Sequence, residues 1–158
     1  MKYISTYEIF ESLSKEIDIY LICDIFSHIM DDNVNVWIWQ FPLKDEKRSS
    51  HSEVWTKLTY TGTKEDKLPK LVPNKEYWFE LEAKIDGKDL TNTLDREKIT
   101  EVGNIIKNYD YASITDRLEE LGLTIDDIVP DFTNWAVTPS MRLSSFAVSK
   151  VKIIMRLL

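Results

Sequence analysis

The sequence predicts an α+β protein built around a small antiparallel sheet or β-barrel, with an N-terminal helix and a helical insertion before the last strand. Three observations support this class. Apolar residues recur at helical spacing near the N-terminus, three central segments alternate between two kinds of side chain, and helical spacing then returns before a final alternating segment. No repeat or Pro/Gly-rich linker divides the chain, so we expect one domain spanning residues 1–158.

The first element is a helix predicted over residues 5–30. Its first apolar side chains fall on one stripe: Ile9, Phe10, Leu13 and Ile17. Ser5 or Thr6 is a suitable N-cap, because its hydroxyl can accept a bond from an unpaired backbone N–H of the first turn. Residues 17–22 are rich in β-branched side chains, so a short strand is the alternative there.

Three strands follow, predicted over residues 34–41, 52–61 and 76–86. One face of these strands is mostly aliphatic: Val34, Val36, Ile38, Val54, Leu58, Phe79, Leu81, Ala83 and Ile85. Four tryptophans occupy the alternate positions and share the other face: Trp37, Trp39, Trp55 and Trp78. A solvated second face would be polar. We therefore expect the rings to be covered by another part of the chain, by a protein partner or by stacked bases.

Helical spacing returns over residues 99–109 and 113–121. Ser113 with Asp116 resembles a capping box, and Gly122 is a typical helix stop. Thr124 with Asp127 repeats the capping signal and predicts one further turn. The final strand, predicted from Met141 to Ile154, has one small and apolar face. Its other face carries Arg142, Ser144, Phe146, Val148, Lys150, Lys152 and Ile154.

Charge and cysteine content narrow the classes of partner and location. The net charge is −7, which opposes nonspecific binding of duplex DNA. No acidic residue follows Asp131, which suggests a local basic strip on an acidic body. The alternative is that these cations belong to a solvated strand face. The lone Cys23 permits no intrachain disulfide, and we expect a cytoplasmic protein. Asp18 and Asp24 interrupt the longest apolar run, so we expect no membrane span.

Catalytic and metal-binding patterns are weak, so we predict a non-catalytic protein without a cofactor or metal. Cys23, His28 and His51 are too few for a zinc site. His28 lies among apolar residues and is expected to be buried, whereas His51 lies in a polar stretch. The carboxylate pairs at residues 31–32 and 126–127 are typical of helix caps and solubilising charge.

The tryptophan face supports a first hypothesis, that the protein binds single-stranded DNA. Aromatic rings act as platforms for bases while lysines neutralise phosphates. The expected contact residues are Trp37, Trp39, Trp55, Trp78, Phe146, Lys57, Lys84, Lys150 and Lys152. The opposing interpretation is that the N-terminal helix lies over the four tryptophans and makes them part of the core.

These segments also resemble a known family. The tryptophan-rich strands from Val34 to Phe41, Glu53 to Tyr60 and Tyr77 to Ile85 resemble those of phage-type single-stranded DNA-binding proteins with an OB fold. The segment from Met141 to Val148 resembles the last barrel strand of such proteins. The resemblance implies a five-stranded OB-like barrel that binds single strands across one face.

A second hypothesis is a small acidic protein-interaction module, such as a toxin-immunity protein or a phage inhibitor of a host defence system. Such proteins present negative charge to basic partners. The residues expected to form this surface are Glu97, Glu101, Asp110, Asp116, Glu119, Glu120, Asp126 and Asp127. The charge beside the tryptophans separates the two hypotheses, since cations favour a nucleic acid and carboxylates favour a basic protein.

Overall fold

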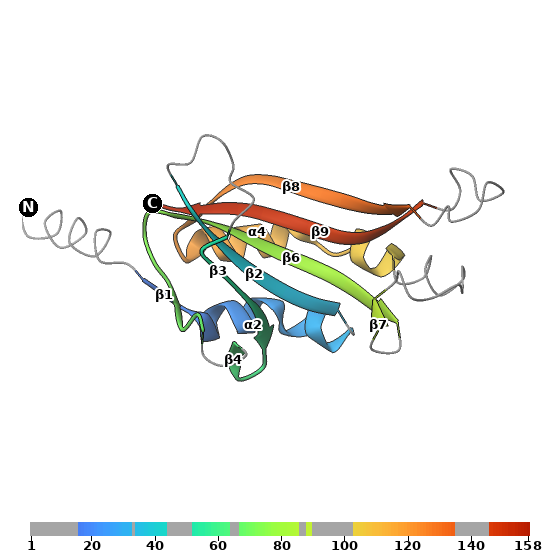
Figure 1. Ribbon diagram of the computed structural model, residues 1–158, viewed down its shortest axis with the longest axis horizontal. Helices are drawn as coiled ribbons and strands as arrows, with labels where there is room; N and C mark the ends of the chain where they lie inside the picture. The colour runs from blue at the N-terminus through green and yellow to red at the C-terminus, as the bar shows by residue number, and fades with distance from the viewer. Residues whose placement is uncertain are drawn as a thin grey trace, which may run out of the picture.

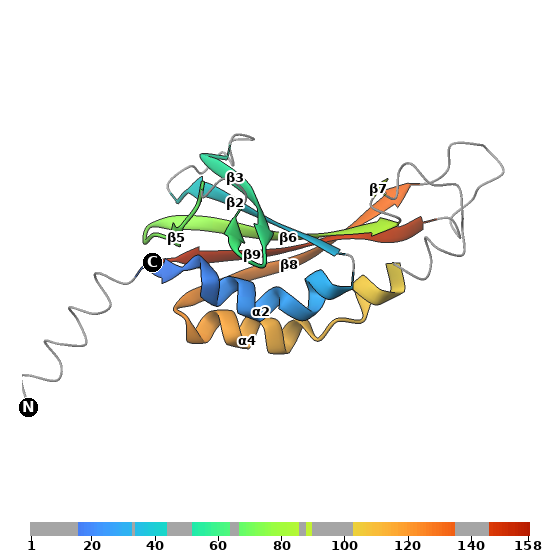
Figure 2. The ribbon, with the colours of Figure 1, turned by 90° about the horizontal axis from the view of Figure 1, so that it is seen from below.

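A computed structural model describes residues 16–32, 34–43, 52–63, 67–85, 88–89, 103–134 and 146–158. The strands are paired antiparallel throughout this part of the chain, and helices pack on one face of the main sheet (Figures 1 and 2). The predicted α+β class is therefore confirmed. The single domain stays a prediction.

Within the described ranges, the main sheet has seven strands and is open. Its order is β4 (Gly62–Thr63), β3 (Val54–Thr59), β2 (Val34–Pro42), β6 (Lys75–Ile85), β9 (Phe146–Leu157) and β8 (Leu123–Asn134), and β7 (Lys88–Asp89) pairs with the end of β6. The three predicted central strands are thus confirmed as β2, β3 and β6. Strands β4 and β8 end the path at opposite edges, so the described strands form the predicted sheet and do not close into the OB-like barrel.

The N-terminal part combines both alternatives that the sequence leaves open. Ile17 and Asp18 form the short strand β1, which pairs with β5 (Lys70–Leu71). Helix α2 (Ile19–Asp31) then begins, and the Asp18 carboxylate caps it by accepting a bond from the Tyr20 N–H at 2.9 Å. Residues 1–15 of the predicted helix, including Ser5 and Thr6, lie outside the described residues.

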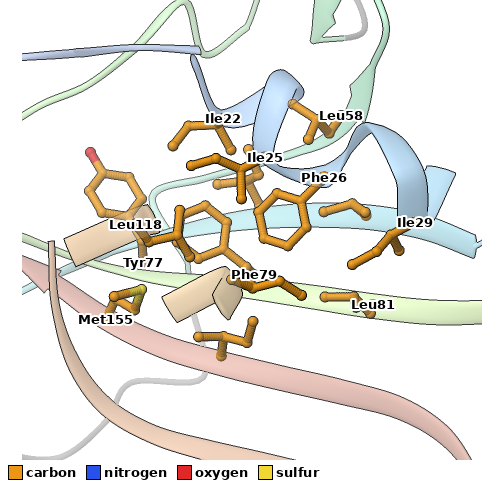
Figure 3. Packing of buried hydrophobic residues seen from close by; sticks show 14 of the residues in the cluster. Ile22, Ile25, Phe26, Ile29, Leu58, Tyr77, Phe79, Leu81, Leu118 and Met155 are labelled. Atoms are coloured by element: carbon orange, nitrogen blue, oxygen red, sulfur yellow. The ribbon is translucent and has the colours of Figure 1, made fainter. Parts of the chain in front are cut away.

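Helix α2 packs on the aliphatic face of the sheet, so this described part of the N-terminal helix does not lie over the tryptophans as the opposing interpretation expected (Figure 2). Its buried side chains recur at helical spacing: Ile19, Ile22, Cys23, Ile25, Phe26 and Ile29. Phe26 meets Phe79 of β6 with 5.6 Å between ring centroids (Figure 3). The aliphatic residues of β2 and β6 already form a continuous apolar surface, so an apolar helix stripe gains most by burying it. No helix in the described part of the chain has the length and hydropathy needed to cross a membrane.

The region after residue 102 differs from the prediction in two ways. Helix α4 (Tyr111–Glu120) is capped by Asp110, whose carboxylate accepts from the Ser113 N–H at 3.1 Å, so Ser113 is not the cap. Residues 124–127 belong to strand β8 and not to a further helical turn. Gly122 ends the preceding helix as predicted, with a φ of 110° that few other residues adopt.

Strand β8 is stabilised by backbone pairing with β9 along nearly its whole length. The two strands pair from Leu123 opposite Leu157 to Asn134 opposite Phe146. Pro130 is tolerated because β8 lies at an edge of the described sheet. Part of the predicted final strand, residues 141–145, lies outside the described residues, and β9 begins at Phe146.

Candidate binding surface

The surface of interest is the outer face of the sheet, the face turned away from helices α2 and α4 (Figure 2). Directly paired residues share a face, so the register defines its rows. One row crosses β3, β2, β6 and β9 as Trp55, Trp39, Trp78 and Ile154. The next row reads Lys57, Trp37, Glu80 and Lys152. The register therefore places all four predicted tryptophans on the outer face.

The tryptophans form two aromatic clusters. Trp55 packs on Trp39 with 5.9 Å between ring centroids and 27° between ring planes, and on Trp37 with 5.5 Å and 46°. Trp78 instead packs on Phe41 at 4.2 Å. Trp55 is 53% exposed, whereas the other three tryptophans are partly buried. Trp55 is therefore the ring most accessible to a ligand.

Two carboxylates accompany the first cluster. Glu80 and Glu82 of β6 lie on the same face as the tryptophans, opposite Trp37 and Asn35 of β2. Lys150 of β9 lies between them, with its Nζ 3.6 Å from Glu80 Oε1 and 3.4 Å from Glu82 Oε2. Direct charge-assisted hydrogen bonds are shorter, about 2.7–2.9 Å. One ammonium group is therefore shared loosely by two carboxylates, and their oxygens keep capacity for another donor.

A shallow hollow of about 200 Å³ opens between these groups. Its lining consists of Trp37, Trp39, Trp55, Glu80, Glu82 and Lys150. Glu80 is only 7% exposed, so its charge is held in a poorly solvated position beside the rings. Sequence alternation placed both glutamates on the tryptophan face, but the cross-strand register that brings them to Trp37 and Trp55 was not readable from the sequence.

The lysines predicted to bind phosphate have different surroundings in the structure. Lys57 lies opposite Trp37. Lys152 lies over the ring of Trp78, with Nζ 4.8 Å from the centroid, and Lys150 is occupied by the two glutamates. Lys84 lies in β6 and Phe146 lies in β9, but the structure describes only the backbone of these two residues. The site residues are thus brought together in part, with Lys150 and Lys152 already in contact with other groups of the face.

Two polar groups of the outer face lack a partner. Asn35 Nδ2 and Trp39 Nε1 are buried donors without a hydrogen bond to the described residues. Buried donors are seldom left unpaired in folded proteins. Both atoms are covered by the protein's own atoms, so neither is open to a ligand in this structure.

The other ionisable residues considered in the sequence have structural neighbours. His28, expected to be buried, is exposed and packs edge-on against Tyr109 at 6.1 Å, because it falls outside the buried stripe of α2. Tyr60 donates to Asp31, and Tyr109 donates to Asp32 at 2.9 Å. His51 is not among the described residues. Within the described ranges, no group of three or more His, Cys, Asp or Glu side chains is placed to hold a metal ion.

The predicted acidic surface is separate from the tryptophans. Asp116, Glu119 and Glu120 are exposed on α4, in the helical layer on the opposite side of the sheet (Figure 2). Asp126 of β8 is paired with Arg156 at 2.8 Å. Glu97 and Glu101 lie outside the described residues. The carboxylates that line the tryptophan hollow are instead Glu80 and Glu82, and Glu76 accepts a hydrogen bond from the Trp78 Nε1–H at 2.8 Å.

Comparisons with known proteins add no relative: no family model, no curated protein and no solved structure matches the chain. The resemblance to phage-type single-stranded DNA-binding proteins stays a prediction. Function is therefore inferred from the geometry of the outer face.

Proposed function

We propose that this chain is a non-catalytic interaction module that captures a positively charged segment of another protein on the outer face of its sheet. The observation that carries the proposal is the presence of Glu80 and Glu82 in the tryptophan hollow. Carboxylates beside the rings favour a cationic partner over a phosphate chain. This function belongs to the class of the second hypothesis, small acidic protein-interaction modules such as toxin-immunity proteins or phage inhibitors of a host defence system.

Both the local charge of the hollow and the net charge of the whole chain support this proposal. In the hollow, two carboxylates and one ammonium group leave one net negative charge. Over the whole chain the net charge is −7, which attracts basic partners and repels polyanions. Two of the lysines that a phosphate chain would need, Lys150 and Lys152, already contact carboxylates or a ring.

The test uses defined peptides and the complete chain. A short peptide rich in arginine and lysine should quench tryptophan fluorescence and release heat in calorimetry. An acidic peptide of equal length should do neither. Trp55→Ala should weaken this binding by about two- to thirtyfold, the range of a cation–π contact. Equal binding of the basic and acidic peptides would contradict the proposal.

A second candidate function, single-stranded DNA binding, is favoured by one specific observation. Trp55 is 53% exposed and lies in the row next to Lys57 on an open sheet face. Base stacking on such a ring is worth about 1–3 kcal/mol per base. An oligo-dT strand should then quench the fluorescence, and Trp55→Ala should remove the effect while thermal stability changes little. Absence of quenching at low salt would end this candidate.

A further inference from the structure

We propose that the tryptophan hollow receives the guanidinium group of an arginine side chain from the partner. This inference rests on the proposed function, because it names the group that the outer face would recognise. The guanidinium would stack on the exposed indole of Trp55 and donate hydrogen bonds to the carboxylates of Glu80 and Glu82. Three features of the hollow support it.

The size of the hollow fits one long side chain. A volume of about 200 Å³ has room for the end of one long side chain such as arginine. Trp55 is the most exposed of the three rings that line the hollow, so a ligand there would contact it most readily.

The chemistry of the lining fits a planar cation. Indole rings are the best aromatic partners for cations, and a cation already lies over one of them on this face, at Lys152 and Trp78. Glu80 and Glu82 add acceptor oxygens that Lys150 satisfies only at 3.4–3.6 Å. A guanidinium would neutralise the single net negative charge of the lining, whereas a phosphate group with one negative charge would raise it to two.

The positions of the two carboxylates favour arginine over lysine. Glu80 and Glu82 are two residues apart on one strand face, and a guanidinium presents several N–H donors in a fixed plane. The ammonium group of a partner lysine is a compact point charge like that of Lys150, and it would compete with Lys150 for the same two carboxylates.

The deciding experiment titrates the complete chain with three peptides of one length, in which arginine, lysine or citrulline occupies the same three positions between glycine and serine. Citrulline has nearly the shape of arginine without its charge. Calorimetry should rank the affinities as arginine above lysine above citrulline. Glu82→Gln should lower the arginine affinity by about fivefold, the effect of one partly exposed ion pair.

The matched control is Glu119→Gln, which makes the same charge change on the exposed surface of α4. It should leave the arginine affinity within about twofold, since the site lies on the other side of the sheet. Thermal melts of both variants establish that each is folded, and the citrulline comparison needs no variant. Equal affinity for the arginine and citrulline peptides, or equal losses in the two variants, would overturn the inference.

The outcomes also separate this inference from the proposed function. Equal binding of the arginine and lysine peptides, reduced by Glu82→Gln, would overturn the arginine preference and leave the basic partner in place. Binding of oligo-dT with no binding of any basic peptide would overturn both proposals and favour the DNA-binding candidate.

Discussion

At the scale of single residues, the face of the sheet on which a side chain of β2 lies decides its surroundings. Val36 and Ile38 are fully buried and Trp37 and Trp39 point to the other face, as the spacing predicts. Alternation cannot tell which residue lies beside which on a neighbouring strand. The proximity of Glu80 and Glu82 to Trp37 and Trp55 depends on that register and was therefore missed.

The same limit applies to the buried polar network around Tyr77. The Tyr77 hydroxyl donates to Gln40 Oε1 at 2.8 Å and accepts from the Val72 N–H at 2.8 Å. Gln40 in turn donates to Glu53 at 3.1 Å, and Lys75 pairs with Glu53 at 2.7 Å. The hydrogen bond from Lys75 lowers the pKa of Glu53.

We predict that Tyr77→Phe lowers the free energy of unfolding by about 1–3 kcal/mol, because it leaves Gln40 Oε1 and the Val72 N–H without this partner in a buried position. Urea denaturation measures the change. Tyr60→Phe is the matched control, since Tyr60 is 59% exposed and the same atom is removed. Equal losses in the two variants would contradict the prediction.

The pH dependence should report the same residue. Burial raises the pKa of Tyr77 to about 12 from an ordinary value of 10. The unfolded chain therefore loses this proton first, and the stabilisation is full below pH 10 and is lost as pH rises towards 12. The wild-type free energy of unfolding should fall more steeply in this range than that of Tyr77→Phe. Parallel curves would show that Tyr77 does not carry the effect.

At the scale of helices and strands, local sequence patterns predicted the secondary structure correctly where tertiary contacts favour the same conformation. They gave the wrong element where tertiary contacts favour another. The three central strands and the stop at Gly122 follow from local pattern. Thr124 and Asp127 resemble a helix start, but pairing with β9 determines their conformation. A single sequence does not contain the strength of that pairing, because it depends on residues about thirty positions away.

The N-cap of α4 offers a direct test at this scale. Asp110→Ala should lower the free energy of unfolding by about 1 kcal/mol, because its carboxylate accepts the Ser113 N–H at 3.1 Å. Ser113→Ala, at the position that the sequence suggests as the cap, should stay within about ±0.5 kcal/mol. Thermal or urea unfolding distinguishes the two. A larger loss for Ser113→Ala would mean that the sequence interpretation was right.

At the scale of the whole molecule, the sequence predicts the α+β class and the antiparallel sheet but not which face the helices cover. An amphipathic helix must bury its apolar stripe, and both sheet faces offered apolar area. Helix α2 packs on the apolar surface of β2 and β6, where Phe26 meets Phe79 (Figure 3). The tryptophans were thereby left on the face without these helices.

This arrangement separates the two ways in which charge should act on binding. The exposed carboxylates of α4 lie across the sheet from the hollow and influence a ligand only through the long-range field. Glu82 lies in the hollow and contacts a bound group directly under our proposal. Long-range charge changes mainly the association rate, whereas a direct contact changes mainly the dissociation rate.

We therefore predict that a basic peptide associates more slowly with the chain as ionic strength rises from low to physiological, because screening weakens the attraction of the −7 charge. Replacing Glu119 and Glu120 together by glutamine moves the net charge from −7 to −5 and should slow association with little change in dissociation. Glu82→Gln should mainly speed dissociation. Stopped-flow tryptophan fluorescence measures both rates. If Glu82→Gln slows association as much as the double variant does and leaves dissociation unchanged, the hollow acts only through its charge and contacts no ligand.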